Sequence, residues 1–180
     1  MHTPERFELS PEFQLFLKGQ PLALGVVQIM IGINHIVFGA VLGNLHSYAV
    51  YCKVPHWASS VSMCSGYQCL AAIKNPTSKL IKIALFFNII AVILSAAAIA
   101  LYLIDLMTPY PYQCSSFPIN NSTNTSNCLI IRSMAMIGQY GIAGALLTFS
   151  CLEFCVATVI SYCGIKAVSY KVETTGVTIH

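Results

Sequence analysis

The sequence is short of charge. Asp, Glu, Lys and Arg make up 8% of its 180 residues, whereas an average soluble domain has about 25%. Hydrophobic residues make up 56% of the chain, and the mean hydropathy is +0.71. This composition argues against a soluble globular protein, and no nucleic-acid partner is expected.

Charged residues are absent from four long stretches of the chain. These stretches are residues 22–45, 54–73, 83–104 and 133–152. Each has close to the roughly 20 residues that an α-helix needs to cross about 30 Å of hydrocarbon. The rest of the chain is divided among two tails and three connections, each too short to bury a separate core. A soluble catalytic domain is excluded by this division.

We therefore predict an all-α integral membrane protein with four transmembrane helices. The expected helices are about 22–45, 54–73, 83–106 and 131–162, within a transmembrane domain of residues 22–165. An N-terminal tail (1–21), an external loop (107–130) and a C-terminal tail (166–180) complete the chain. The second helix contains four serines, and we expect its insertion to depend on neighbouring helices.

Two independent signals predict that both termini are cytosolic. Seven Lys and Arg residues fall in the tails and the middle connection, against two on the other side, and positive charge favours the cytosol. The external loop has three overlapping Asn-x-Ser/Thr glycosylation sequons, which are used only in the lumen. They are Asn120, Asn121 and Asn124. Because Asn120 and Asn121 are adjacent, we expect at most one of these two to be occupied.

The external loop also contains Cys114 and Cys128. We expect a disulfide between them, because the lumen is oxidising and the bond would stabilise the fold by about 3 kcal/mol through chain entropy. Cys69 and Cys163 fall near the inner membrane surface. Each of these two is either a palmitoylation site or a small apolar packing residue.

Small and polar residues recur at alternating spacings of four and three along the spans. Such a 3.5-residue repeat predicts close packing in a left-handed four-helix bundle. In the third span this stripe consists of Ala84, Asn88, Ala91, Ser95, Ala98, Tyr102 and Asp105. In the first and fourth spans the stripes include Gly25, Gly32, His35, Gly39, Gly138 and Gly141. Packing this close argues against a wide aqueous pore formed by one chain.

Glu153 is the one charged-type residue well inside a span. A charge at the bilayer centre costs about 2.5–3.5 kcal/mol, so Glu153 needs a partner or a proton. With a rise of about 1.5 Å per residue, Gln28, Asn88 and Glu153 all fall about 10 Å from the cytosolic surface. We expect them to form one polar layer, either a hydrogen-bonded structural cluster or a proton or cation site. No residues with catalytic or metal-ligand spacing accompany it, so no enzyme activity, metal or cofactor is expected.

The first span resembles that of a known family. The run 24–32, LGVVQIMIG, followed by His35 and Gly39, is similar to the first-helix signature of the membrane-spanning four-domains subfamily A. This is the family of the B-lymphocyte surface antigen and the IgE-receptor beta chain. Further matches are Pro55-His56-Trp57, Ser65-Gly66, Ile104-Asp105 and Glu153. The resemblance covers about residues 20–165; His56 departs from it, since an aromatic or apolar residue is usual there.

The resemblance implies a non-enzymatic tetraspan protein that modulates receptor signalling. Such a chain would lie in the lipid bilayer as a homo-oligomer, with a dimer expected first, or as a hetero-oligomer with related chains. It would act as an adaptor for a cell-surface signalling receptor at the plasma membrane, with an internal membrane as the alternative location. The C-terminal tail has Tyr170 but no paired activation motif, so any signal would pass through partners. Two other functions stay open: a subunit or regulator of a cation (calcium) channel, and a receptor for lipids or small apolar ligands.

Overall fold

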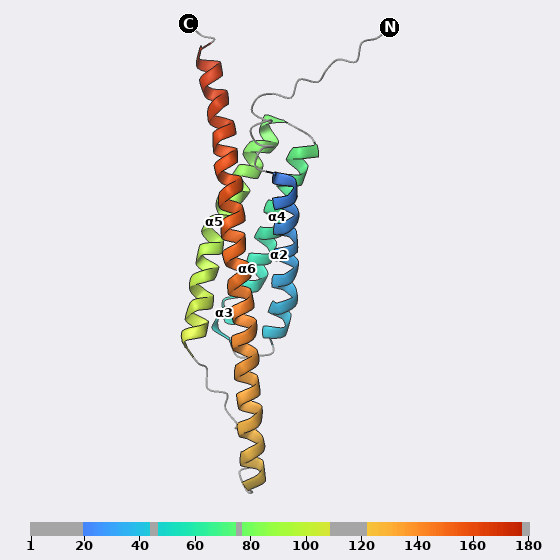
Figure 1. The fold of residues 1–180 in the computed structure, drawn as a ribbon, viewed down its shortest axis with the longest axis vertical. Helices are drawn as coiled ribbons and strands as arrows, with labels where there is room; N and C mark the ends of the chain where they lie inside the picture. The colour runs from blue at the N-terminus through green and yellow to red at the C-terminus, as the bar shows by residue number, and fades with distance from the viewer. Residues whose placement is uncertain (1–19, 44–46, 75–76, 109–121, 178–180) are drawn as a thin grey trace, which may run out of the picture.

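The computed structural model describes residues 20–43, 47–74, 77–108 and 122–177. Four long helices in this part of the chain run side by side (Figure 1). They are α2 (Pro21–Leu42), α4 (Val54–Lys74), α5 (Ser78–Met107) and α6 (Ser122–Val177), with the one-turn helix α3 (Tyr48–Tyr51) between α2 and α4. The start of α2 and the end of α6 lie toward the same end of the bundle. The described part of the chain is therefore an all-helical bundle.

Among the described residues, three helices are long and apolar enough to cross a membrane. They are α2, the stretch Lys79–Met107 of α5 and the stretch Cys128–Ser169 of α6. α4 has 21 residues, which is long enough for a crossing, but its serines lower its hydropathy. The hydroxyls of Ser59 and Ser60 donate hydrogen bonds of 2.8 and 2.9 Å to the carbonyl of His56 in the same helix. α4 thus satisfies some of its polar groups by itself.

Two helices are longer than the charge-free spans of the sequence. α5 begins at Ser78 rather than at residue 83, and α6 runs from Ser122 to Val177 rather than from 131 to 162. A charge-free stretch marks the part of a helix that lipid can surround. The helix itself continues through Lys and Arg, because both residues are good helix formers. α6 therefore includes the end of the expected external loop and the start of the C-terminal tail.

The bundle is built from two helix pairs, since α2 packs most closely against α4 and α5 against α6. The contact between α2 and α4 depends on glycine. A Cβ added to Gly66 would lie 2.5 Å from the carbonyl oxygen of Gly25, and one added to Gly25 would lie 3.0 Å from the carbonyl oxygen of Gly66. Gly32 also lies against the backbone of α4, and Gly39 lies against the ring of Pro55. Small residues permit this close approach of two membrane helices.

α5 turns its stripe of small and polar residues toward the interior. Every residue of this stripe is buried, with an exposed fraction of 6% or less. The seven residues are Ala84, Asn88, Ala91, Ser95, Ala98, Tyr102 and Asp105. The 3.5-residue repeat therefore marked the buried face of this helix.

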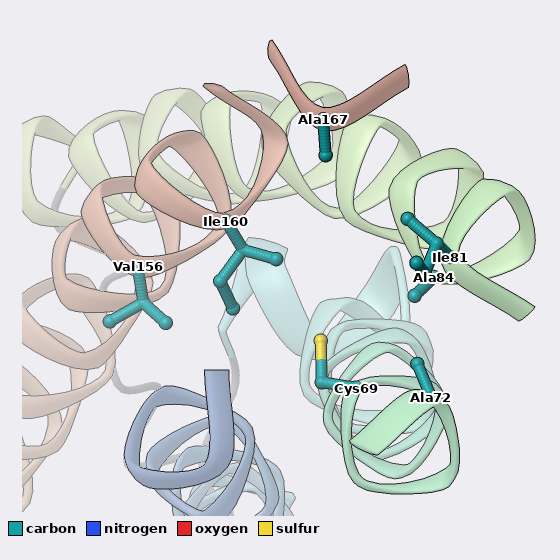
Figure 2. Close-up of a cluster of buried hydrophobic side chains, with 7 residues drawn as sticks. All are labelled: Cys69, Ala72, Ile81, Ala84, Val156, Ile160 and Ala167. Atoms are coloured by element: carbon teal, nitrogen blue, oxygen red, sulfur yellow. The ribbon is translucent and has the colours of Figure 1, made fainter. Parts of the chain in front are cut away.

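Two clusters of buried apolar side chains lie at different heights of the bundle. The first joins α4, α5 and α6 and is shown in Figure 2; it contains Cys69, Ala72, Ile81, Ala84, Val156, Ile160 and Ala167. The second contains Leu42, Ala49, Val54, Ala98, Tyr102 and Leu146. Along α5 and α6, Asn88 and Glu153 fall between the members of the two clusters. The two apolar clusters thus lie on either side of a polar layer.

Asp105 connects the end of α5 to the start of α3. Its Oδ2 accepts a hydrogen bond of 2.5 Å from the Ser47 hydroxyl, and its Oδ1 accepts one of 2.8 Å from the backbone N–H of Tyr48. The residue is only 1% exposed. The carboxylate therefore acts as a cap for the first turn of α3, supplied by a different helix.

Gly138 and Gly141 differ from the glycines of α2. A Cβ added to either would meet no described atom within 4 Å. The N-terminal part of α6 extends beyond the other helices (Figure 1). Neither glycine makes a close packing contact with another described helix. The expected packing stripe on the fourth helix is corrected accordingly, and its buried positions include Ala143, Leu146 and Ser150.

We predict that Gly66→Ala destabilises the bundle by about 1–3 kcal/mol, because the new methyl group overlaps the Gly25 carbonyl and forces the two helices apart. Gly138→Ala is the matched control. It places the same methyl group in open space and is expected to be neutral or to stabilise α6 by up to about 1 kcal/mol. Thermal unfolding of the purified protein in detergent micelles measures both effects. A Gly66→Ala protein as stable as the unmodified one would contradict the close contact.

Candidate functional site

Three polar side chains from three helices meet inside the bundle. The amide nitrogen Nε2 of Gln28 donates one hydrogen bond of 2.9 Å to Asn88 Oδ1 and another of 3.2 Å to Glu153 Oε1. Gln28 and Asn88 are fully buried, and Glu153 is 3% exposed. The structure thus brings together the three residues that the sequence placed in one layer. Gln28, on α2, connects α5 to α6.

Asn88 extends this network to α4. Its Nδ2 donates a hydrogen bond of 2.8 Å to the Ala84 carbonyl of its own helix and one of 3.2 Å to Cys69 Sγ. Cys69 has no exposed surface, and Figure 2 shows its sulfur directed into the space between the helices. A buried sulfur that accepts a hydrogen bond favours the packing alternative for Cys69 over palmitoylation. Cys163 is partly exposed, and its acylation stays a prediction.

A second polar contact joins α2 to α6. His35 is 1% exposed, and its Nε2 lies 3.2 Å from Ser150 Oγ. Its Nδ1 lies 3.0 Å from the carbonyl oxygen of Ile31. The Ser150 hydroxyl also lies 2.9 Å from the Leu146 carbonyl, which can accept its hydrogen. Ser150 was not identified from the sequence, although it lies three residues before Glu153 and therefore on the same side of α6.

A small cavity lies between these two polar contacts. Residues from all four long helices line it, and its polar lining comes from His35, Ser62, Ser95, Ser150 and Glu153. Its volume, taken as the space open to the centre of a water molecule, is about 10 Å³. This is room for about one water, and it is too small for a file of hydrated ions.

Two buried oxygens of the polar layer have no hydrogen-bond partner among the described residues. They are Gln28 Oε1 and Glu153 Oε2. An ionised carboxylate left in this way is costly in an apolar interior, so Glu153 needs a proton or a balancing charge. In the described part of the chain, no group of three or more His, Cys, Asp or Glu residues is arranged to hold a metal ion. The chemistry that these side chains offer is hydrogen bonding and proton exchange.

The predicted modification sites of the external loop fall mostly outside the described residues. Cys114, Asn120 and Asn121 are outside them, whereas Asn124 and Cys128 lie in the first two turns of α6. The disulfide and the glycosylation therefore stay predictions.

Comparison with known proteins identifies the family. A model of the CD20-like family matches residues 23–165, the range that contains the whole polar layer. Human membrane-spanning 4-domains subfamily A member 15 is 38% identical over 97 residues, which cover 51% of this chain and 40% of that protein. Human member 8 is 30% identical over 167 residues, covering 84% of this chain and 62% of that protein. Human member 12 is 31% identical over 150 residues, which cover 78% of this chain and 50% of that protein.

The aligned part covers 40–62% of these three relatives, so this chain matches about half of their length. The relatives and the apolar helices together indicate a multi-pass membrane protein in contact with the lipid bilayer. The family model covers most of the chain. The chain therefore belongs to the CD20-like family and is similar to the membrane-spanning 4-domains subfamily A proteins.

Proposed function

We propose that this chain is a tetraspan adaptor that modulates signalling by a receptor in the plasma membrane. The observation that carries the proposal is the closed interior of the bundle. Glycine contacts close the α2–α4 interface, and the polar layer bonds mainly to itself. In the described part of the chain, an interior of this kind holds the helices together and has room for about one water, so the function is expected at the outer surface.

The outer surface of the bundle is apolar and suits contact with lipid or with a partner helix. On α2, one face exposes Val26, Met30, Ile33, Val37 and Val41 by 42–55%. Packing between transmembrane helices depends on shape and van der Waals contact, and such faces can bind a second copy of the chain, a related chain or a receptor helix. This is the support for a homo- or hetero-oligomer. As part of the same proposal, the chain has no enzyme activity of its own.

Four crossings with cytosolic termini complete the proposed topology. The relatives are named for four membrane-spanning domains, and α4 has a suitable length for the fourth crossing. α4 is packed against α2, and its serine hydroxyls bond to its own backbone. These contacts lower the cost of placing a helix of modest hydropathy in the bilayer. The loop between α5 and α6 would then face the lumen or the cell exterior.

A cation-channel subunit is the second candidate function. The feature that favours it is Glu153, a buried carboxylate in the polar layer with one oxygen, Oε2, left without a partner. Conduction would then run between subunits or along an edge of the bundle, because the internal cavity has a volume of only about 10 Å³. A receptor for lipids or small apolar ligands is the third candidate and rests on the apolar outer faces alone.

Photo-crosslinking at lipid-facing positions tests the adaptor proposal. A photoreactive amino acid is placed singly at four exposed positions: Val37 on α2, Tyr67 on α4, Phe86 on α5 and Val159 on α6. We predict a protein adduct from one or two of these faces and lipid adducts from the others, since an oligomer or receptor covers part of the surface. Mass spectrometry of native membranes identifies the partner. Lipid adducts alone at all four positions would overturn the adaptor proposal.

Calcium uptake separates the adaptor from the channel. Glu153→Gln keeps the shape of the side chain and removes its ability to carry a charge. We predict that calcium entry into cells expressing this variant equals entry with the unmodified protein, when surface expression is matched. His56→Gln, an exposed position on α4, is the control for a substitution outside the layer. A tenfold loss of calcium entry with Glu153→Gln alone would support the channel and count against the adaptor.

Glycosylation and disulfide formation test the topology. We predict that a glycosidase shifts the gel mobility of the protein and that substituting Asn120, Asn121 and Asn124 together by Gln abolishes the shift. Cys114→Ser and Cys128→Ser should each expose one extra thiol to a maleimide reagent. Reduction should reverse the difference, because it frees two thiols in the unmodified protein and none in either variant. A protein that resists the glycosidase and shows no masked thiols would contradict an external loop between α5 and α6.

A further inference from the structure

The hydrogen bonds of His35 depend on where its protons are. Nδ1 faces the Ile31 carbonyl at 3.0 Å, and a carbonyl only accepts, so Nδ1 carries a proton. The Ser150 hydroxyl has one hydrogen and two neighbours, the Leu146 carbonyl and His35 Nε2, at 2.9 and 3.2 Å. If the hydroxyl donates to the Leu146 carbonyl, a hydrogen bond between His35 and Ser150 requires Nε2 to donate, and His35 is then a cation. If the hydroxyl donates to Nε2, His35 is neutral.

Glu153 faces the same cavity as this pair. Its Oε1 accepts from Gln28, whereas its Oε2 is buried without a partner. Glu153, Ser150 and His35 all line the cavity, which has room for about one water. One water-sized cavity is therefore lined by a carboxyl group with an unpartnered oxygen and by a histidine–serine pair. Together with a water molecule, these groups can form a proton relay.

We propose that the cavity binds one water molecule that links Glu153 Oε2 to Ser150 and His35, and that Glu153 and His35 hold a single proton between them. The proton passes from Glu153 Oε2 to the water, a proton of the water passes to Ser150 Oγ, and the original hydroxyl proton passes to His35 Nε2. The reverse order restores the start. Only O–H and N–H bonds form and break, and no redox partner is needed. The proposal is independent of the adaptor role.

The charge balance supports one shared proton. With the proton on Glu153 both groups are neutral, and with it on His35 they form an opposite pair, so the net charge is zero in both states. A second proton leaves one uncompensated positive charge in the interior, and loss of the proton leaves one negative charge. Both are costly in an apolar medium. Among the described residues, the other titratable groups near this region are Cys69 on α4 and Tyr102 on α5, with Asp105 one turn beyond Tyr102.

A second proton would weaken the contact between the two helix pairs. His35 with Ser150 and Gln28 with Glu153 both join α2 to α6. An uncompensated charge between these helices opposes their contact. Acid is therefore expected to loosen α2 from α6, whereas the glycine contact between α2 and α4 is unaffected.

Nitrogen NMR of ¹⁵N-histidine-labelled full-length protein in lipid bilayers tests the proposal. The His35 signals are those lost in His35→Gln, and their charge state is followed against pH. We expect Glu153→Gln to move the midpoint of the His35 transition to lower pH by at least one unit, a tenfold change, because a neutral amide no longer balances the imidazolium. His56→Gln should leave the midpoint unchanged. An identical His35 midpoint in the unmodified protein and in Glu153→Gln would overturn the proposal of a shared proton.

Two further measurements keep the test decisive if Glu153→Gln does not fold. Infrared spectroscopy of the carboxylic C=O band follows Glu153, and its transition should move in His35→Gln to higher pH by a similar amount, because coupling between two sites is reciprocal. Val61→Leu narrows the cavity and replaces no titratable residue, and it should shift the His35 midpoint. Val159→Leu, on the lipid-facing side of α6, should leave the midpoint unchanged. Unchanged transitions in both measurements would refute the relay.

Discussion

The cost of an unpaired polar group in an apolar interior is the constraint on which this bundle depends. Bulk water does not reach the layer to replace a missing hydrogen bond, so its polar side chains bond to partners on other helices. Gln28 uses both N–H groups of its amide, one toward α5 and one toward α6. Asn88 likewise uses both of its N–H groups, and it brings in α4. Two amide side chains therefore connect all four long helices.

The small residues follow from this constraint. An amide side chain is short, and its hydrogen bonds reach about 3 Å, so the helices must approach closely before the layer can form. Gly25 and Gly66 bring the backbones of α2 and α4 into contact, and the alanines of the α5 stripe are buried inside the bundle. Asp105 performs a related task at the end of the bundle, where it holds the first turn of α3. Polar bonds and small side chains thus depend on each other.

The sequence predicts the features that depend on period and depth. The repeat along α5 identifies its buried face, and the common depth of Gln28, Asn88 and Glu153 identifies the layer, because helix geometry converts residue number into position. The sequence alone does not predict features that depend on how neighbouring helices pack. Nothing in the sequence shows that Cys69 faces Asn88, that a Cβ on Gly138 would meet open space, or that His35 and Glu153 line one cavity. Each of these needs the rotation and offset of helices that contact each other.

A closed polar layer also limits the kinds of response that the bundle can give. Packed interiors change between discrete arrangements rather than deforming continuously, and here the discrete elements are few: the Ser150 hydroxyl with its two neighbours, and the bonds that join α2 to α6. The α2–α4 contact is fixed by backbone against backbone, so a change in the layer is expected to move one helix pair against the other. Such a movement would alter the apolar outer surface, where the proposed partner helices would bind. The proposed adaptor would transmit a signal in this way.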